Sequence, residues 1–375
     1  NGNTTGGQNT AVGKQAMNTS STGSNNASVG YQSLYANTTG SSNTAVGAQS
    51  LDANTTASNN TSIGYQSLTT NTTGASNTAV GQSALSTNST GSSNTAMGRQ
   101  ALLANTTASE NTAVGYQALY ANTTGDGNTA IGVKAMDANT VGDRNVAVGA
   151  DALGSMNPDS NADTYNTAVG YNAGYAVTTG KENTIVGGLA GDALTTGNYN
   201  VIVGSQSDST AIDSEKAQGF GFNLDCAAGY TTIGSGSDDI RAAHGNVTWA
   251  TVSDERYKKD IVDSTAGLSF INALQPRTFK YKTLGELPET FSAYEADSTE
   301  VFKNSDTNHG FIAQEVKAAI DADTSIKDGF RLWDDRDDGS QEVAEAALIP
   351  VLTKAIQELS AQVDALTARI ETLEG

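Results

Sequence analysis

One short pattern recurs along the first 208 residues and constrains the fold more than any other feature of this chain. A Gly preceded by Val, Ile or Met, with Asn four residues before it, returns every 17 residues from Gly13 to Gly149 and, after one step of 21, from Gly170 to Gly204. Ala or Ser follows three residues after each Gly, and Leu or Met follows four residues after it in the first nine repeats. A helical-hairpin repeat needs about 33–47 residues, so this period is too short for one.

Each repeat is typical of a short β coil stacked on its neighbours. Ala-Val-Gly favours a strand, whereas Asn-Thr-Thr-Gly favours a turn. Twelve such coils at the strand spacing of ~4.8 Å would form a rod about 55–60 Å long. The regularly placed Asn could form a side-chain ladder, and the Gly could permit a turn or a close backbone approach. We therefore expect a mainly β fold with a parallel β-roll or solenoid over residues 1–208.

The apolar content of each coil favours an assembly of several chains. One coil offers about one Val, one Leu and a few Ala for burial, which is little against the entropy lost when 17 residues are ordered. Burying a second face against identical chains would offset more of that loss. We therefore expect a rod made of several copies of this chain.

The repeat also resembles known families. Asn-Thr-Ala-Val-Gly-x-x-Ala/Ser-Leu is similar to the head repeats of trimeric autotransporter adhesins and to repeats of bacteriophage tail fibres. Those heads are parallel β-rolls in which three chains share a core, so the resemblance implies a homotrimer. The last three repeats depart from the pattern, because Gly174, Gly191 and Asp208 stand where Leu was. The insertion at 154–165 predicts a protruding loop.

The surface of the repeats leaves two questions open. Asn-x-Thr and Asn-x-Ser sequons occur in nearly every turn, but they follow from the repeat itself, so N-glycosylation is the less favoured interpretation. Four tyrosines directly follow the repeat Gly and could stack on sugars, or simply pack over a neighbouring side chain: Tyr31, Tyr65, Tyr116 and Tyr171.

Charge and cysteine content argue against several classes of function. The chain has 20 basic and 40 acidic residues and a net charge of −20, which argues against nucleic acid and anionic lipid as partners. No apolar run approaches the ~20 residues of a membrane span, so we expect no membrane insertion. The single Cys226 excludes an intrachain disulfide framework and a Cys-rich zinc site. Residues 334–345 faintly resemble a calcium loop, but Arg336 occupies a ligand position, so we expect a β-turn there, no metal and no cofactor.

A change in composition divides the chain. Residues 1–208 contain 5 basic and 11 acidic residues, whereas residues 209–375 contain 15 and 29. The 17-residue period also breaks near residue 208. We therefore expect a β-rich connector over 209–252, a small α+β domain over 253–347 and a C-terminal helix over 348–375.

The segment from Ser253 to Ile261 opens the expected α+β domain. By itself it places a hydroxyl five residues from the amine of Lys258, a spacing that does not lie on one helical face. Its pattern Ser-Asp-x-Arg-x-Lys-Lys-x-Ile nevertheless resembles the start of the endosialidase-type C-terminal intramolecular chaperone domain of phage tail spikes and fibres. Similar elements follow in the expected order at 268–279, 309–316 and 352–359. The motif residues that we assign to this domain are Asp254, Arg256, His309, Gly310, Phe311, Gln314 and Glu315.

In that family the chaperone assembles three chains and then cuts itself off. By the matching positions, the resemblance implies that Ser253 is the nucleophile and Lys258 the general base. A Ser hydroxyl is a weak nucleophile until a base takes its proton, and a Lys amine can be that base only when it is neutral. Burial on assembly would favour the neutral amine by desolvation, so cleavage could wait for correct assembly. We favour attack on the Val252 carbonyl and a cut on the N-terminal side of Ser253, although the sequence leaves the side open. His309 could be a third catalytic group, but a structural role at a strand-to-helix junction is favoured.

The C-terminal segment carries a heptad of apolar residues with alternating spacings of three and four. This pattern predicts a coiled coil of parallel identical chains. β-Branched residues at a with Leu at d favour two strands in isolation, so the expectation of a trimer rests on the resemblance. The a and d positions are Ile349, Leu352, Ile356, Leu359, Val363, Leu366, Ile370 and Leu373.

Together these features favour a structural, host-contacting segment of a phage tail fibre in the virion. The chain begins inside a repeat at Asn1, so we expect a longer protein whose missing N-terminal part joins other virion tail proteins. A host cell-surface receptor, such as a glycan, is the other expected partner. The alternative is a trimeric adhesin on the bacterial cell surface with a non-cleaving trimerisation cap.

A third hypothesis is a glycan-degrading spike. Acids of the repeat part such as Glu110, Asp126 and Asp143 lie at expected turns and offer no convincing catalytic pair. We therefore expect at most a single-turnover serine autoprotease and no enzyme that turns over a separate substrate.

Overall fold

The computed structural model describes residues 4–245, 255–323, 326, 332–335 and 339–374. The chain divides into two units, residues 1–253 and residues 254–375. The first unit contains the repeats, and the second contains the helices among the described residues.

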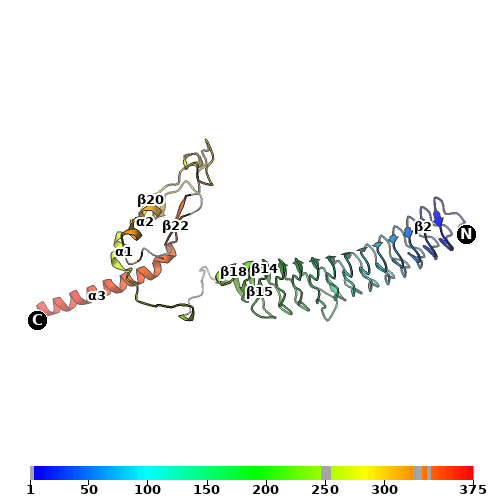
Figure 1. Cartoon of the computed structure of the whole chain (residues 1–375), viewed down its shortest axis with the longest axis horizontal. Coiled ribbons are helices and arrows are strands. Elements are labelled where there is room, and N and C mark those ends of the chain that lie inside the picture. The colour runs from blue at the N-terminus through cyan, green and yellow to red at the C-terminus, as the bar shows by residue number, and fades with distance from the viewer. Residues whose placement is uncertain (1–3, 246–254, 324–325, 327–331, 336–338, 375) are drawn as a thin grey trace. The chain divides into compact units, whose positions relative to one another are not determined.

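The first unit is a β-solenoid built on one long sheet (Figure 1). Within the described residues, this sheet contains fifteen strands, and each is hydrogen-bonded to the next one along it. Twelve are strands of three residues: β1 (Thr10–Val12), β2 (Ala27–Val29), β3 (Thr44–Val46), β4 (Thr61–Ile63), β5 (Thr78–Val80), β6 (Thr95–Met97), β7 (Thr112–Val114), β8 (Thr129–Ile131), β10 (Val146–Val148), β12 (Thr167–Val169), β13 (Thr184–Val186) and β14 (Val201–Val203). The last three are longer: β16 (Gln218–Phe222), β18 (Tyr230–Ser235) and β19 (Asp238–Ala243).

The register of the sheet is parallel and places equivalent repeat positions side by side. Thr44 lies opposite Thr61, for example, and Val46 lies opposite Ile63. Two short strand pairs lie beside the main sheet: β9 (Gly142–Asp143) with β11 (Ala162–Asp163), and β15 (Asp208–Ser209) with β17 (Asp225–Cys226). The predicted parallel solenoid of 17-residue coils is therefore confirmed.

The sheet continues beyond residue 208, where the repeats were expected to end. Val201 lies opposite Gln218, which is again one step of 17 residues. β18 then adds a further parallel strand, and β19 closes the sheet with an antiparallel pairing. The signal for the additional coil was incomplete, because Gly221 keeps the period but Ala217 replaces the usual Asn. About thirteen coils result, counting the strands from β1 to β16 in the described residues.

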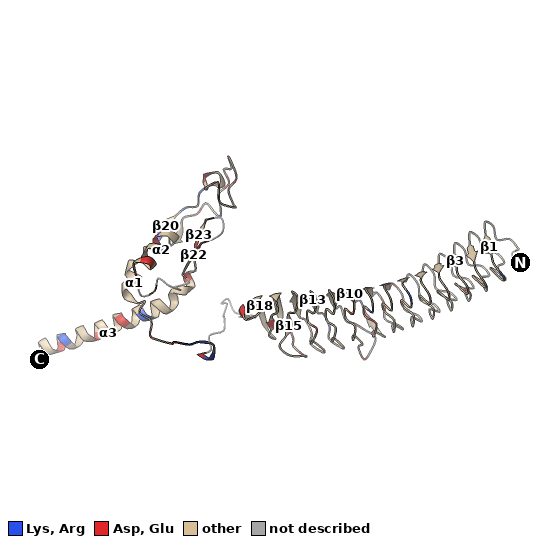
Figure 2. Ribbon diagram, viewed as in Figure 1, with Lys and Arg blue, Asp and Glu red and all other residues tan. Residues whose placement is uncertain are grey.

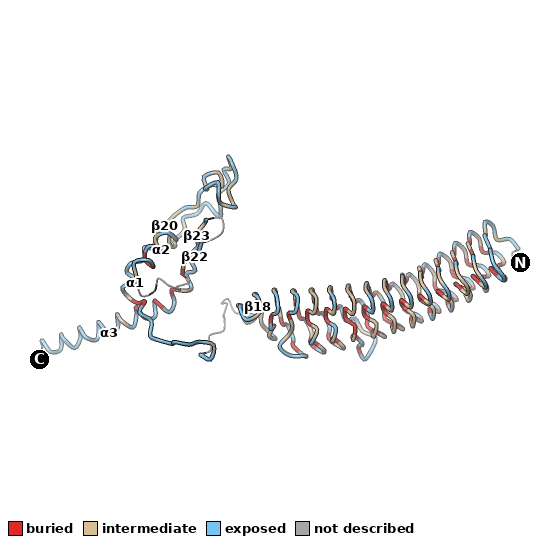
Figure 3. The backbone as a smooth tube through the Cα atoms, viewed as in Figure 1, coloured by how far each residue is buried: buried red, intermediate tan, exposed pale blue. Residues whose placement is uncertain are grey.

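The core of the solenoid is a set of buried columns that run along its length (Figure 3). In the three-residue strands from β2 to β14 the middle residue is buried and its two neighbours are more exposed, as the pleat requires. The residue four after the repeat Gly fills the centre, and Leu85 is fully buried there. Leu85 has a φ of 54°, a conformation that β-branched residues rarely adopt, which explains Leu or Met rather than Val or Ile at this position.

The expected Asn ladder is present and is fully internal. The side-chain oxygen of Asn77 accepts a hydrogen bond of 2.9 Å from the backbone N–H of Asn94, and the same bond recurs coil after coil. A second ladder passes through the Asn of each Asn-Thr-Thr-Gly stretch: Asn88 donates to the side-chain oxygen of Asn71 at 2.9 Å. These Asn side chains are buried because their amides satisfy polar groups that the turns would otherwise leave unpaired.

The repeat Gly is required by a close approach between coils. Gly81 has a φ of +135°, and a Cβ added there would lie 2.5 Å from the carbonyl oxygen of Gly98. No L side chain fits in that space without moving the backbone of the next coil.

The last repeats replace the missing Leu by a different packing. Gly174 and Gly191 stand at the Leu position with φ values of +60° and +56°. The inward strand residue changes from Ala to Ile185, and Val177 and Leu194 are fully buried beside it. The larger inward side chain occupies the space that Leu fills in the earlier coils, so the core continues.

The second unit contains a small α+β fold and a long helix. Its helices pack around Phe270, Val316, Ile320, Leu332 and Val351. None of the described helices is both long and apolar enough to span a membrane. Its elements are η1 (Glu255–Tyr257), α1 (Leu268–Ala273), β20 (Arg277–Phe279), η2 (Leu284–Glu286), β21 (Asn308–Gly310), α2 (Ala313–Ala322), β22 (Trp333–Asp335), β23 (Gln341–Val343), η3 (Glu345–Ala347) and α3 (Leu348–Glu374).

Candidate functional site

Of the predicted cleavage dyad, the structure describes Lys258, which lies near the start of the second unit. Lys258 follows η1, where its backbone N–H donates a hydrogen bond of 2.9 Å to the carbonyl oxygen of Glu255. Its side chain is exposed, as is that of Arg256 within η1. Three predicted residues lie outside the described part of the chain: Val252, Ser253 and Asp254. The Ser253–Lys258 dyad therefore stays a prediction.

The predicted motif at 309–316 joins a strand to a helix. β21 pairs with β20 in antiparallel register, with His309 opposite Thr278 and Gly310 opposite Arg277. The chain then enters α2 at Ala313. The His309 side chain is exposed on this strand. His309 therefore lies just before the strand-to-helix junction that the sequence predicted.

Glu315 in α2 forms a bidentate ion pair with Arg277 in β20. Arg277 donates from Nε to Oε2 at 2.9 Å and from Nη2 to Oε1 at 2.7 Å. The hydrogen bonds from Arg277 lower the pKa of the Glu315 carboxyl, and the same bonds raise the pKa of Arg277. The pair ties the strand to the helix that follows it. Sequence reasoning selected Glu315 but not Arg277, whose partner lies 38 residues away.

An open aromatic groove of about 830 Å³ lies beside the motif. Phe279 and Tyr281 meet edge to face with ring centroids 5.4 Å apart, and Tyr281 meets Phe302 in the same way at 5.8 Å. His309, Phe311 and Gln314 also line this groove. Phe311 in addition packs against the core of the unit. The motif therefore contributes both to the core and to a surface groove.

The described ends of the segment with a faint likeness to a calcium loop belong to two paired strands. β22 and β23 pair in antiparallel register, with Trp333 opposite Val343 and Asp335 opposite Gln341. A search of the described residues finds no group of three or more His, Cys, Asp or Glu side chains that could hold a metal ion. Residues 336–338 between these strands lie outside the described part of the chain, so the predicted turn stays a prediction.

Comparison with protein families finds a match that covers the start of this unit. Residues 253–324 match the family described as the chaperone of endosialidase. The match contains η1, α1, the β20–β21 pair and α2. This match and the β-solenoid of 17-residue coils together support a tail-fibre-like protein with a C-terminal chaperone domain. Searches of curated proteins and of solved structures found no match.

The long helix α3 of the chaperone domain has two different apolar faces. Leu348, Val351 and Ala355 are buried against the domain core. The eight predicted heptad residues, from Ile349 to Leu373, remain between 42% and 78% exposed. The family match ends before α3, so the assignment of 352–359 to the family pattern stays a prediction. One helix thus holds the domain together and also presents an unpartnered apolar row.

The solenoid presents apolar residues along the outward side of its sheet. Since equivalent positions lie side by side, the last residue of each strand joins one row. Its most exposed members are Val12, Val29, Val46, Ile63, Met97, Ile131 and Val169. The tyrosines that follow the repeat Gly are exposed as well, and Arg99 lies over the ring of Tyr116 at 5.7 Å. Charged residues are sparse along this unit and more frequent in the chaperone domain (Figure 2).

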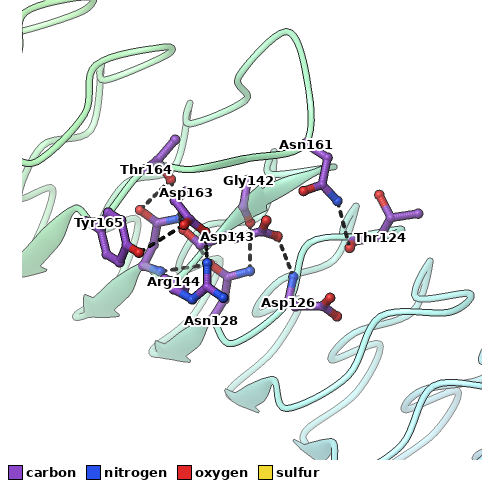
Figure 4. A network of polar contacts seen from close by, with 11 residues as sticks. Thr124, Asp126, Asn128, Gly142, Asp143, Arg144, Asn161, Asp163, Thr164 and Tyr165 are labelled. Atoms are coloured by element: carbon purple, nitrogen blue, oxygen red, sulfur yellow. Dashed lines mark hydrogen bonds and ion pairs between the residues drawn. The ribbon is translucent and has the colours of Figure 1, made fainter.

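The insertion at 154–165 is anchored to the solenoid by a polar network (Figure 4). Arg144 forms an ion pair with Asp163, and the Tyr165 hydroxyl donates a hydrogen bond of 2.9 Å to the same carboxylate. Thr164 donates to the side-chain oxygen of Asn145 at 2.8 Å. Only part of the insertion therefore projects, because its last residues pair with β9 and Met156 is buried.

The acids of these turns act as hydrogen-bond acceptors for the backbone. Asp143 accepts from the N–H of Asp126 at 2.7 Å, and Asp126 accepts from the N–H of Ser109. In other coils a Ser hydroxyl fills the same position, as Ser41 does for Ser24. These two carboxylates thus have a structural role in the stacking of coils.

Proposed function

We propose that this chain is a homotrimeric, host-contacting segment of a phage tail fibre. Its chaperone domain drives assembly of the three chains and then cuts the chain next to Ser253. Ser253 is the nucleophile and Lys258 the general base. The protein resides in the virion tail, joined to other tail proteins.

The exposed apolar row of α3, attached to a domain of the chaperone family, is the observation that carries this proposal. The described residues from Leu359 to Glu374 are all exposed in the single chain. Most helical stability in proteins comes from packing of an apolar face, and apolar side chains on one face favour association with identical helices. The outward apolar row of the solenoid supports the same arrangement along the shaft.

The proposed cleavage needs no cofactor. Lys258 takes the hydroxyl proton while Ser253 Oγ attacks the carbonyl carbon of Val252. The amide bond between Val252 and Ser253 breaks, an ester forms on Oγ, and the proton passes to the released amine of Ser253. Water then hydrolyses the ester, which frees the Val252 carboxylate and restores the Ser253 hydroxyl.

Host contact is assigned to the solenoid. Its exposed tyrosines offer flat apolar rings with a polar tip, a combination suited to stacking on the sugars of a cell-surface glycan. The receptor is therefore proposed to be a host surface molecule such as a glycan.

The test is a denaturing gel with intact mass measurement on the wild-type chain, Ser253→Ala, Lys258→Ala and the matched control Lys259→Ala. We expect a fragment of residues 253–375 from the wild type and from Lys259→Ala only. The fragment mass distinguishes a cut before Ser253 from a cut after it. Sedimentation of the same samples reports whether three chains associate.

Two results would contradict the proposal in different ways. If the wild-type chain forms a folded trimer but is not cleaved, the domain is a permanent trimerisation cap. That arrangement is the one expected for the adhesin alternative. A monomeric wild type removes the proposed assembly altogether.

A further inference from the structure

Two charged residues near the end of α3 have no partner within their own helix. Arg369 has Ala365, Leu366, Thr372 and Leu373 at the positions three and four residues away, so no acid lies within reach along the helix. Glu374 has Ile370 and Glu371 on that side. Among the ion pairs found in the described residues, none includes Arg369 or Glu374. By contrast, Lys354 and Glu358 lie four residues apart and form a pair.

Both residues flank the exposed apolar row. With Val363 and Ile370 at a, Arg369 takes position g and Glu374 takes position e of the heptad. Side chains at e and g border the seam of a coiled coil and contact the neighbouring helix. The other residues at these positions are uncharged: Leu348, Thr353, Ala355, Ser360, Gln362 and Thr367.

The pattern of charge selects one arrangement of helices. In a parallel coiled coil in register, a g residue faces the e residue five positions later in the neighbouring helix, which places Arg369 opposite Glu374 of a second copy. A shift by one or more heptads would place Thr367, Ser360 or no residue opposite Arg369. An antiparallel neighbour would bring g beside g, and the four g positions contain no carboxylate.

We propose that Arg369 of one copy pairs with Glu374 of the next copy, and that this pair fixes the parallel, unshifted register of the C-terminal helices. The inference rests on the proposed homotrimer and names the contact that aligns its chains. The apolar a and d residues provide the affinity, whereas the ion pair provides discrimination against shifted or antiparallel neighbours. A trimer contains this pair three times.

The test uses the full chain with Arg369→Glu, Glu374→Arg, the double variant that exchanges both charges, and Asp364→Arg as the control. Asp364 is exposed at a b position, away from the seam, and neither Arg369 nor Glu374 lies three or four residues from it. Each single reversal places like charges opposite each other, and we expect the chain concentration at half-assembly to rise roughly tenfold. The double variant should return to the wild-type value, and Asp364→Arg should not change it. When the two single variants are refolded together, mixed oligomers should exceed the statistical share.

A second measurement reports the register directly. Ile370→Cys places identical residues next to each other in a parallel, unshifted coil, so a disulfide should join two chains on oxidation. The native Cys226 is buried and does not compete.

The outcomes separate this inference from the function on which it rests. The proposed register would be overturned if oligomers of the Ile370→Cys variant form no disulfide between chains. It would also be overturned if the double variant assembles no better than the single variants. A wild-type chain that remains monomeric would instead overturn the proposed homotrimer.

Discussion

The carboxylate of Glu358 in α3 accepts a hydrogen bond of 2.8 Å from the backbone N–H of Leu268, the first residue of α1. The residue before α1, Gly267, supplies no side-chain cap, and a Cβ there would lie 2.5 Å from Glu358 Oε2. A carboxylate at a helix N-terminus satisfies an unpaired donor and complements the helix dipole. The long helix therefore holds the start of α1, which follows the predicted cleavage segment in the chain.

Replacement of Glu358 by Ala should destabilise the chaperone domain by about 0.5–2 kcal/mol, because it removes the cap of α1. Urea unfolding of the full chain, followed by helical circular dichroism, measures the loss. Glu371→Ala, on the exposed part of the same helix, serves as the control and should have little effect. Equal losses in both variants would show that loss of a carboxylate from α3 in general, not of the cap, is responsible.

Replacement of Asn94 by Ala should destabilise the solenoid by about 2–4 kcal/mol, since buried backbone groups would lose their partners. Asn94 accepts from the N–H of Asn111 and donates to the carbonyl oxygen of Ala108, both within the interior. Thermal unfolding followed in the far ultraviolet checks the change, with exposed Thr90→Ala as the control. An unchanged midpoint for Asn94→Ala would mean that the ladder contributes nothing to stability.

The contribution of the Arg277–Glu315 pair should depend on pH. The folded-state pKa of Glu315 lies below its ordinary value of 4.5, so the pair stabilises the domain above that pH and the contribution fades as pH falls through the lowered pKa. Glu315→Gln should lower the urea midpoint modestly at pH 6, and the difference from wild type should shrink at about pH 3.5. Exposed Glu289→Gln should show no such trend. A difference that is the same at both pH values would exclude an ionic origin.

Cys226 should resist thiol reagents in the folded protein. Its side chain is fully buried, and burial, with smaller effects of Asp208, Asp225 and Asp239, raises the pKa of the thiol to about 12. Little reactive thiolate is therefore present at pH 8. Labelling by a disulfide reagent should become fast only in denaturant, whereas Thr210→Cys, at an exposed position, should react at once. Rapid labelling of the native wild type would mean that the end of the solenoid opens readily.

The solenoid could be predicted because its determinants repeat. Gly81, Leu85 and the inward Ala79 recur at fixed spacing, so any stacked arrangement in register buries equivalent residues together. The turn Asn was harder to place. Asn88 lies in an Asn-Ser-Thr-Gly sequon typical of an exposed turn, yet it is buried because its amide bonds to the Asn side chain and turn carbonyl next to it.

The extent of the solenoid was less predictable than its form. Residues beyond 208 lose the Asn and gain Phe220 and Phe222, but their backbone still pairs with β14 in the same register. Backbone hydrogen bonds between strands do not depend on which side chain a residue carries. The pairing can therefore persist after the repeated residues have changed. The sheet therefore continues where the pattern has faded.

For the chaperone domain, the sequence by itself determined the short motifs, the heptad row of α3 and the charge placement of Arg369 and Glu374, because these depend only on spacing along a helix or strand. Only the tertiary structure decided that Arg277 pairs with Glu315, that Glu358 holds Leu268, and that Leu348 and Val351 turn one face of α3 to the core. The first two contacts join residues 38 and 90 positions apart. Such distances along the chain become contacts through the packing of whole elements, which no local pattern encodes.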